Sequence, residues 1–194
     1  MSKVLFYLII KPISLLPYPI IYGISNVISF LFFYIIPYRK KVVAKNLENS
    51  FPQKNKKELN TIARKFYTHL SDIIVESVKL FSITQKQIDH RFSIKNPEIL
   101  QTYFDQGRDV ILVGGHYNNW EMLAVGINQI VPHDCIGIYT KLSNPFFDDK
   151  MKSSRSKFGL KMINTREVTS NFIEKNKTPR MTIFGADQSP TYSK

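Results

Sequence analysis

The sequence predicts an α/β fold, a mostly parallel sheet flanked by helices, which is preceded by an N-terminal membrane-anchoring helix. The sheet is predicted because four apolar runs of strand length, residues 109–115, 134–140, 160–163 and 180–186, alternate with segments of helical periodicity. Strands that alternate with helices favour a parallel sheet covered on both faces. The anchor is predicted because residues 12–36, a stretch of 25 positions, contain no charged side chain. That length is enough to enter or span a bilayer.

The apolar N-terminal segment is interrupted in its first part by Pro12, Pro17 and Pro19. Its uninterrupted portion, residues 20–36, would form a helix about 25 Å long at about 1.5 Å per residue. A tilted single span, a helical hairpin and a half-inserted anchor all fit this length, and a buried helix of a soluble protein is the alternative without a membrane. A secretory signal peptide fits less well because no small-residue cleavage site follows the apolar stretch.

A basic cluster, Arg39-Lys40-Lys41, follows the apolar segment directly. The positive-inside rule places such a flank, and the domain after it, in the cytoplasm. We therefore divide the chain into a membrane anchor, residues 1–37, and a domain, residues 38–194.

The formal net charge of +12 is concentrated near the N-terminus, where residues 1–65 hold eleven Lys and Arg against two Glu. Such a block indicates an anionic partner, which can be a lipid surface, a nucleic acid or an acidic protein. The basic cluster after an apolar segment favours a membrane. No helix-turn-helix, RNP-like or zinc-finger pattern is present, so we predict no nucleic-acid partner. A non-catalytic basic module that binds anionic lipid or nucleic acid is the alternative.

Two helices are predicted between the anchor and the sheet. Residues 39–51 form a short amphipathic helix, and residues 56–81 form a longer one whose apolar side chains recur at helical spacing. The longer helix carries His69, Asp72 and Glu76 near one face. We interpret these three as a polar stripe because no second cluster of ligands stands out, and we predict no metal and no cofactor.

The remaining elements alternate in type along the chain. The single cysteine, Cys135, lies in an apolar run and is predicted to be a buried structural thiol rather than a nucleophile. Gly107 and Gly159 are predicted to end helices. The expected helices are residues 97–106, 118–130, 144–158 and 166–175, and the expected strands are residues 91–95, 109–115, 134–140, 160–163 and 180–186.

The most informative segment is residues 113–121, VGGHYNNWE, in which a strand and two glycines lead to His116 and then to Glu121 at the start of a helix. Acyl transfer to a hydroxyl needs a base near neutral pH, and His is the side chain whose unperturbed pKa lies there. A nearby carboxylate can fix the tautomer of the ring and stabilise the imidazolium. We therefore expect the side chains of His116 and Glu121 to face each other. Asn118 or Asn119 followed by Glu121 also fits a capped helix N-terminus.

A second acidic residue, Asp187, follows the last predicted strand. Sites in open α/β sheets form beyond the carboxyl ends of the strands. His116 also follows a strand, so the two residues are expected at the same edge of the sheet although they lie 71 positions apart.

Several elements, in this order, resemble the lipid A biosynthesis lauroyl/myristoyl acyltransferase family, a branch of the lysophospholipid acyltransferase-like superfamily. The His-to-Glu segment GGHYNNWE is the most specific of them. The resemblance covers nearly the whole chain. The other matching elements are Arg39…Asn46-Leu47…Phe51-Pro52, Gly107-Arg108-Asp109-Val110-Ile111-Leu112, Tyr139…Asn144-Pro145, Arg155-Ser156-Lys157-Phe158-Gly159 and Asp187-Gln188.

This resemblance implies a glycerol-3-phosphate acyltransferase-like fold. It also implies an enzyme that moves a fatty acyl group from acyl carrier protein to a hydroxyl of a lipid A precursor or related glycolipid. His116 would be the general base with Glu121 as its partner, and Arg155 and Asp187 would complete the site. Arg155 suits a phosphate or an oxyanion. Asp187 could orient Arg155 or the acceptor, or cap the next element.

Asn118 and Asn119 are candidates for substrate binding through their side chains, with helix capping as the alternative. The acidic acyl carrier protein would dock on part of the basic surface. The resemblance implies the bacterial inner membrane, with the catalytic domain on the cytoplasmic side. Members of the family continue beyond the Asp-Gln block, so the chain is expected to be truncated at its C-terminus. A hydrolase with a Ser nucleophile is a competing class, but no Gly-x-Ser-x-Gly elbow is present.

Overall fold

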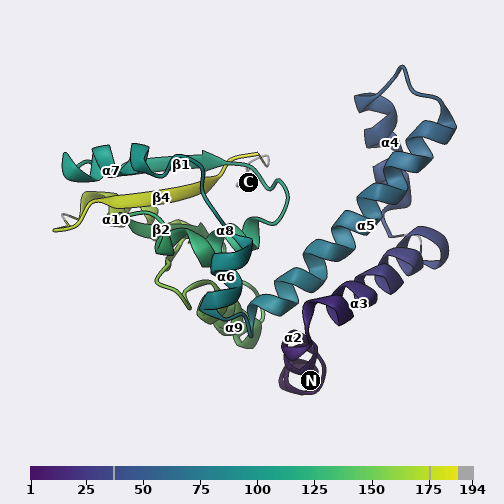
Figure 1. Cartoon of the computed structure of the whole chain (residues 1–194), viewed down its shortest axis with the longest axis horizontal. Helices are drawn as coiled ribbons and strands as arrows, with labels where there is room; N and C mark the ends of the chain where they lie inside the picture. The colour runs from purple at the N-terminus through teal and green to yellow at the C-terminus, as the bar shows by residue number, and fades with distance from the viewer. Residues whose placement is uncertain (37, 175, 188–194) are drawn as a thin grey trace.

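A computed structural model of the chain describes residues 1–36, 38–174 and 176–187. An N-terminal helical arm leads into an α/β unit and projects to one side of it (Figure 1). The predicted helices at residues 20–36, 39–51 and 56–81 are confirmed in this arm. The arm consists of α1 (Ser2–Leu5), the π-helical turn η1 (Phe6–Ile10), α2 (Lys11–Leu15), α3 (Tyr18–Phe30), the π-helical turn η2 (Leu31–Ile35), α4 (Lys40–Ser50) and α5 (Lys56–Leu80).

The strands of the α/β unit are all parallel within the described residues, which confirms the predicted fold class. Their order is β1-β4-β2-β3, so the last of them along the chain lies between the first two. Helices connect the strands, as parallel pairing requires. The elements are α6 (Gln85–Arg91), α7 (Glu98–Asp105), β1 (Val110–Gly114), α8 (Trp120–Gly126), η3 (Ile127–Gln129), β2 (Asp134–Tyr139), α9 (Pro145–Arg155), β3 (Lys161–Asn164), η4 (Thr165–Glu167), α10 (Val168–Ile173) and β4 (Arg180–Gly185).

The strand predicted at residues 91–95 is wrong. Helix α6, which starts with a capping box at Thr84, extends through Arg91, and the segment after it has no regular structure. The apolar alternation in this segment has another cause. Phe92 packs on a cluster at the end of α5, whereas Ile94 packs on a second cluster beneath the sheet.

The other predicted elements of the α/β unit are confirmed, with shifted ends. The predicted helix 118–130 is α8 followed by the 3-10 turn η3, and the predicted helix 166–175 is the 3-10 turn η4 followed by α10. Gly107 and Gly159 follow α7 and α9 with φ angles of 69° and 104°, a conformation that glycine adopts without steric cost. Three positions used in the predictions, Pro37, Lys175 and Gln188, lie outside the described residues.

A ladder of side-chain hydrogen bonds joins α3 to α5, which run side by side in opposite directions (Figure 1). The acidic residues of the predicted polar stripe on α5, Asp72 and Glu76, therefore serve in helix packing. The three pairs of the ladder are Tyr22 with Glu76 at 2.6 Å, Ser25 with Asp72 at 2.6 Å, and Ser29 with Thr68 at 3.1 Å.

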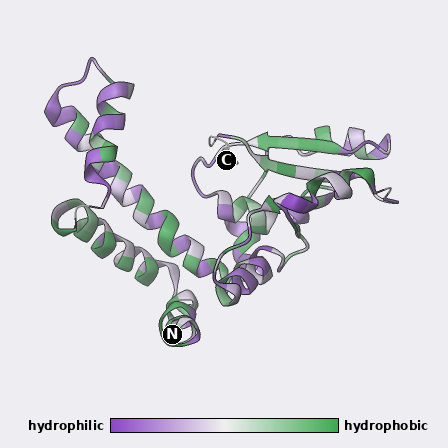
Figure 2. Cartoon of the chain, turned by 180° about the vertical axis from the view of Figure 1, so that it is seen from behind, coloured by the Kyte–Doolittle hydropathy of each residue, from purple (hydrophilic) through white to green (hydrophobic). Residues whose placement is uncertain are grey.

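Two of the three buried side chains of α3 are small and polar, and its exposed side chains include large apolar ones. Ser25 and Ser29 are buried against α5, whereas Val27 and Phe30 are exposed. Figure 2 shows the run of hydrophobic residues along α3. By length and composition, the stretch Tyr18–Ile35 could cross a membrane, and only 22% of it is buried.

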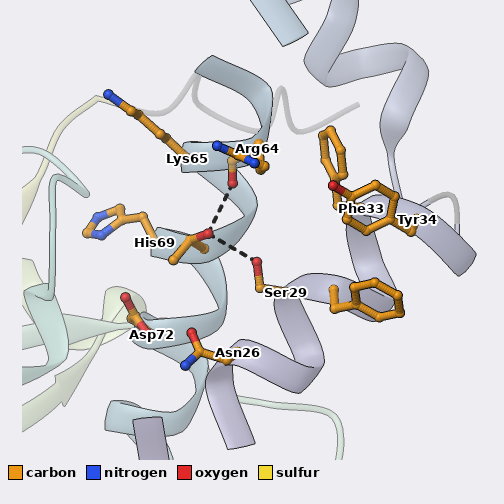
Figure 3. A pocket seen from close by; sticks show the side chains of 10 residues that line it. Asn26, Ser29, Phe33, Tyr34, Arg64, Lys65, His69 and Asp72 are labelled. Carbon is orange, nitrogen blue, oxygen red and sulfur yellow. Dashed lines mark hydrogen bonds between the residues drawn. The ribbon is translucent and has the colours of Figure 1, made fainter. Parts of the chain in front are cut away.

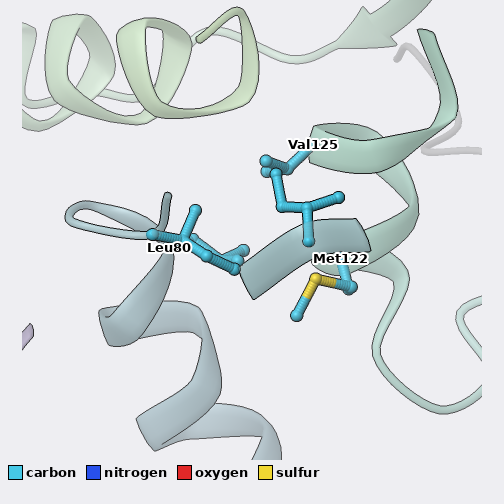
Figure 4. Packing of buried hydrophobic residues seen from close by; sticks show 5 residues of the cluster. Leu80, Met122 and Val125 are labelled. Atoms are coloured by element: carbon cyan, nitrogen blue, oxygen red, sulfur yellow. The ribbon is translucent and has the colours of Figure 1, made fainter. Parts of the chain in front are cut away.

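Two apolar clusters hold the α/β unit together. In the first, Leu80 at the end of α5 packs with Met122 and Val125 of α8, which ties the arm to the unit (Figure 4). The second lies between the sheet and helices α7 and α8 and includes Cys135 and Met181. Burial raises the pKa of the Cys135 thiol to about 12. The prediction of a buried structural thiol is confirmed.

The opposite face of the sheet is only partly covered within the described residues. Phe172 of α10 packs on Phe184 of β4, with ring centroids 6.3 Å apart. Ile111 and Val113 of β1 point to this same face by strand alternation and are exposed.

Candidate active site

His116 lies just beyond the carboxyl end of β1, in the loop that leads to α8. The main chain turns at Asn118, whose φ of 55° is in the left-handed region that asparagine tolerates better than most residues. Asn119 then caps α8, since its Oδ1 accepts a hydrogen bond from the N–H of Met122 at 3.0 Å. The strand β1, the turn at Asn118 and the helix cap at Asn119 together hold His116 at the edge of the sheet.

Asp187 lies beside His116 at this edge, which confirms the expected proximity of the two residues. Nδ1 of His116 is 2.7 Å from Oδ1 of Asp187, and the backbone N–H of His116 donates to Oδ2 at 2.8 Å. The register of the sheet causes this arrangement. Gly114 of β1 pairs with Gly185 of β4, so the residues two positions later in each chain segment meet.

The carboxylate of Asp187 determines which nitrogen of the imidazole faces the solvent. Hydrogen bonds from the side chain and the backbone of His116 lower the pKa of the Asp187 carboxyl below its ordinary value. A carboxylate only accepts hydrogen bonds, so the shared proton belongs to Nδ1 of the neutral ring. Nε2 is then the basic nitrogen. The side chains of His116 and Asp187 are 35% and 43% exposed. The rings of His116 and Trp120 pack in a T-shaped arrangement, with their centroids 5.1 Å apart.

The expected contact between His116 and Glu121 is replaced by an ion pair between Glu121 and Arg155. Arg155 of α9 donates from Nε to Oε2 at 2.8 Å and from Nη2 to Oε1 at 2.5 Å. The Glu121 side chain is only 10% exposed and that of Arg155 24%. The reason is that Asp187 already occupies Nδ1 of the imidazole, while a permanently charged guanidinium binds a carboxylate through two donors.

Asn119 also connects the site to the helical arm. Its Nδ2 donates to Oε2 of Glu76 on α5 at 2.5 Å, and Glu76 accepts a second hydrogen bond from the hydroxyl of Tyr22 on α3. The Asn119 side chain is therefore engaged in capping and in this link, whereas Asn118 is exposed. Sequence reasoning did not assign Glu76 to the site. Its place in the polar stripe of α5 was the one available signal.

An apolar cavity of about 410 Å³ opens beside His116, between the sheet and α8. His116, Glu121 and Arg155 line one end of it. The cavity follows β4 from Gly185 to Met181, four residues or about 13 Å at about 3.3 Å per residue. The apolar side chains that line it include Ile94, Leu100, Leu112, Leu123, Ile127, Leu160, Met162, Met181 and Ile183.

Two glycines leave the space in which the imidazole and the carboxylate meet. A Cβ added to Gly185 would lie 2.9 Å from Cε1 of His116, and one added to Gly115 would lie 3.3 Å from the Asp187 side chain. The sequence offered only a weak signal for Gly185, a glycine at the end of an apolar run.

Replacing Gly185 by Ala is expected to displace the imidazole with little loss of stability, because the atom it would strike is the end of a side chain that can rotate away. A displacement of about 1 Å at a catalytic group can lower the rate about 100-fold. The measurement is the catalytic rate together with the thermal unfolding temperature.

The matched control for this substitution is Gly23→Ala in α3. Gly23 does not line the apolar cavity, and within the described residues no atom lies within 4 Å of a Cβ added there. Equal loss of activity in both variants would contradict the steric argument.

A basic imidazole at the mouth of an apolar cavity, on the edge of a parallel sheet, is the arrangement expected of an enzyme that acts on long-chain acyl groups. Comparison with known proteins agrees with this class. Residues 2–193 match the profile of the family described as bacterial lipid A biosynthesis acyltransferase, and the chain belongs to that family. The resemblance found in the sequence is thus confirmed.

One relative is the lipid A biosynthesis lauroyltransferase of Escherichia coli (strain K12), which is 24% identical over 181 residues. The match covers 87% of this chain and 58% of that protein, so the chain spans less than two thirds of the length of its relative.

Proposed function

We propose that the intact protein transfers a fatty acyl group from acyl carrier protein to a hydroxyl of a lipid A precursor or related glycolipid. The observation that carries this proposal is the His116–Asp187 pair at one end of the apolar cavity. The cavity would hold the acyl chain, with its thioester carbonyl at the imidazole. Part of the basic surface would bind the acidic acyl carrier protein.

In this reaction the acceptor hydroxyl gives its proton to Nε2 of His116 while its oxygen attacks the thioester carbonyl carbon. Asp187 holds the ring and compensates the charge of the imidazolium. When the tetrahedral intermediate collapses, the carbon–sulfur bond breaks, and the imidazolium returns the proton to the leaving thiolate. An ester and a free thiol result.

Arg155 would stabilise the oxyanion or bind a phosphate of the acceptor. A guanidinium has five N–H donors, and Glu121 accepts from two of them, so donors remain for a ligand. Glu121 would then position Arg155 rather than His116. The exposed Asn118 would contact the acceptor, and Asn119 would hold the loop in place.

We further propose that residues 1–37 anchor the protein in the bacterial inner membrane, with residues 38–194 on the cytoplasmic side. The outward-facing apolar side chains of α3 support an environment of lipid. The basic cluster Arg39-Lys40-Lys41 after them supports the orientation.

Filling the cavity is expected to shift the enzyme towards shorter acyl donors. Met162 of β3 lines the cavity, so Met162→Trp would occupy volume that the chain needs. Transfer efficiency should fall by about tenfold or more for each methylene that no longer fits. The measurement is competition between acyl carrier proteins that carry different chain lengths, with products identified by mass spectrometry.

The control is Ile163→Trp, because neighbouring residues of a strand point to opposite faces. This variant should keep the chain-length preference of the unmodified protein. The proposal would be contradicted if the intact protein binds anionic lipid but transfers no acyl group from any donor. That result would favour a non-catalytic basic module.

A further inference from the structure

A second cavity, of about 550 Å³, lies between α3 and α5, away from the apolar cavity (Figure 3). We call it the α3–α5 groove. Phe30 of α3 and Tyr34 of η2 contribute an aromatic wall, and both are exposed. Arg64, Lys65 and His69 line it from α5.

The basic side chains of the groove are available to a ligand. Among the described residues, neither Arg64 nor Lys65 forms an ion pair with an acidic side chain. The acidic residue of the groove, Asp72, accepts a hydrogen bond from Ser25 at 2.6 Å. An Arg and a Lys that line the same cavity suit a phosphomonoester, which carries about two negative charges and several acceptor oxygens.

A third cavity, of about 580 Å³, lies between α5 and the loop that carries His116. Its lining includes His69 and Ile73 of α5 on one side and His116 and Asn118 on the other. His69 therefore borders both cavities, and His116 borders both this cavity and the apolar one. The imidazole thus borders the apolar cavity and a second cavity, which shares His69 with the α3–α5 groove.

We propose that the α3–α5 groove binds the phosphate-bearing head of the acceptor amphiphile. Arg64, Lys65 and His69 contact the phosphate, the apolar part of the amphiphile lies along Phe30 and Tyr34, and the acceptor hydroxyl reaches His116 through the third cavity. The identity of the ligand as the acceptor rests on the proposed function.

The geometry limits the size of this acceptor. From Arg64 to Ile73, nine residues of α5 extend about 14 Å at about 1.5 Å per residue. We therefore expect the phosphate and the acylated hydroxyl to lie on the order of 10 Å apart, as in an extended head group.

The test measures binding to vesicles, so it does not depend on catalysis. Phosphatidylcholine vesicles carry either phosphatidic acid, a phosphomonoester, or phosphatidylglycerol, a phosphodiester. The phosphatidylglycerol content is raised until both have the same electrophoretic mobility. We expect at least about fivefold tighter binding to the phosphatidic acid vesicles, since the monoester accepts more charge-assisted hydrogen bonds.

The groove variant is Arg64→Gln with Lys65→Gln, and the matched control is Lys45→Gln with Lys57→Gln, which removes equal charge from α4 and from the first turn of α5. The groove variant should lose the preference for phosphatidic acid, and the control should keep it. Loss of the preference in both variants, or no preference in the unmodified protein, overturns the proposal. So does full displacement by inorganic phosphate, which would make the site one for free anions.

A kinetic measurement separates this inference from the proposed function. With a phosphorylated glycolipid as acceptor, the groove variant should raise KM for the acceptor about tenfold or more while kcat changes little. An unchanged KM in an active enzyme overturns the groove inference alone. If the intact protein transfers no acyl group, the vesicle preference still decides whether the groove binds phosphomonoesters.

Discussion

Replacing His116 by Ala is expected to abolish acyl transfer in the intact protein, with a loss of at least about 1,000-fold in kcat. The Glu121 carboxylate at the same end of the apolar cavity cannot take over as base because it is held in an ion pair with Arg155. Asp187→Asn should lower kcat by about the same factor. The amide would reverse the hydrogen bond to Nδ1, so the wrong nitrogen of the ring would face the acceptor, and such a change in a catalytic triad costs about 10⁴-fold.

The activity lost in Asp187→Asn depends on pH through the ionisation of the Asp187 carboxyl. The pKa of the Asp187 carboxyl is lowered, chiefly by the hydrogen bond from the His116 side chain. An acid whose pKa is depressed in the folded state keeps its interaction above the ordinary pKa and loses it as the pH falls through the lowered value. The deficit of Asp187→Asn should therefore shrink as the pH falls through the lowered pKa of the carboxyl, because the unmodified protein then loses the same interaction.

Initial rates with acyl carrier protein as the donor would measure both variants, and circular dichroism would confirm their folding. His90→Ala is a suitable control because His90 is exposed on α6, away from the cavity. Near-normal turnover by His116→Ala would end the proposal that this imidazole is the base.

Breaking the ion pair of Glu121 and Arg155 is expected to have the second largest effect, and it should reduce both stability and activity. Arg155→Ala leaves the more deeply buried carboxylate without a partner, which costs about 3–5 kcal/mol of unfolding free energy. Glu121→Ala should cost less because the Arg155 side chain is more exposed. Chemical denaturation of each variant would measure the difference.

A double variant separates structure from catalysis at this pair. Glu121→Leu combined with Arg155→Met removes both charges and keeps most of the volume, so most of the lost stability should return. Activity should stay at least about 100-fold below normal because the donors for the oxyanion or phosphate are gone. A stable and fully active double variant would show that the pair is structural only.

Most of the fold could be predicted because local patterns determine it. Helix α5 was expected at residues 56–81 and runs from Lys56 to Leu80, since its periodicity and its cap at Asn55 are encoded within a few residues. The apolar runs that became strands are equally local signals. The error at residues 91–95 arose where apolar alternation came from tertiary contacts of Phe92 and Ile94 rather than from a sheet.

The candidate site also has one part that local sequence patterns predict and another part that depends on tertiary packing. The sequence by itself determined that a histidine follows one strand, that an acid follows another, and that both lie at one edge of a parallel sheet. Which carboxylate holds His116 was decided only by the tertiary structure. The register of β1 with β4 places the Asp187 carboxylate at Nδ1 of the His116 ring. The packing of α9 beside α8 places the Arg155 guanidinium at the Glu121 carboxylate. Spacing along the chain cannot specify such pairs, because they depend on how elements distant in sequence are aligned when they pack.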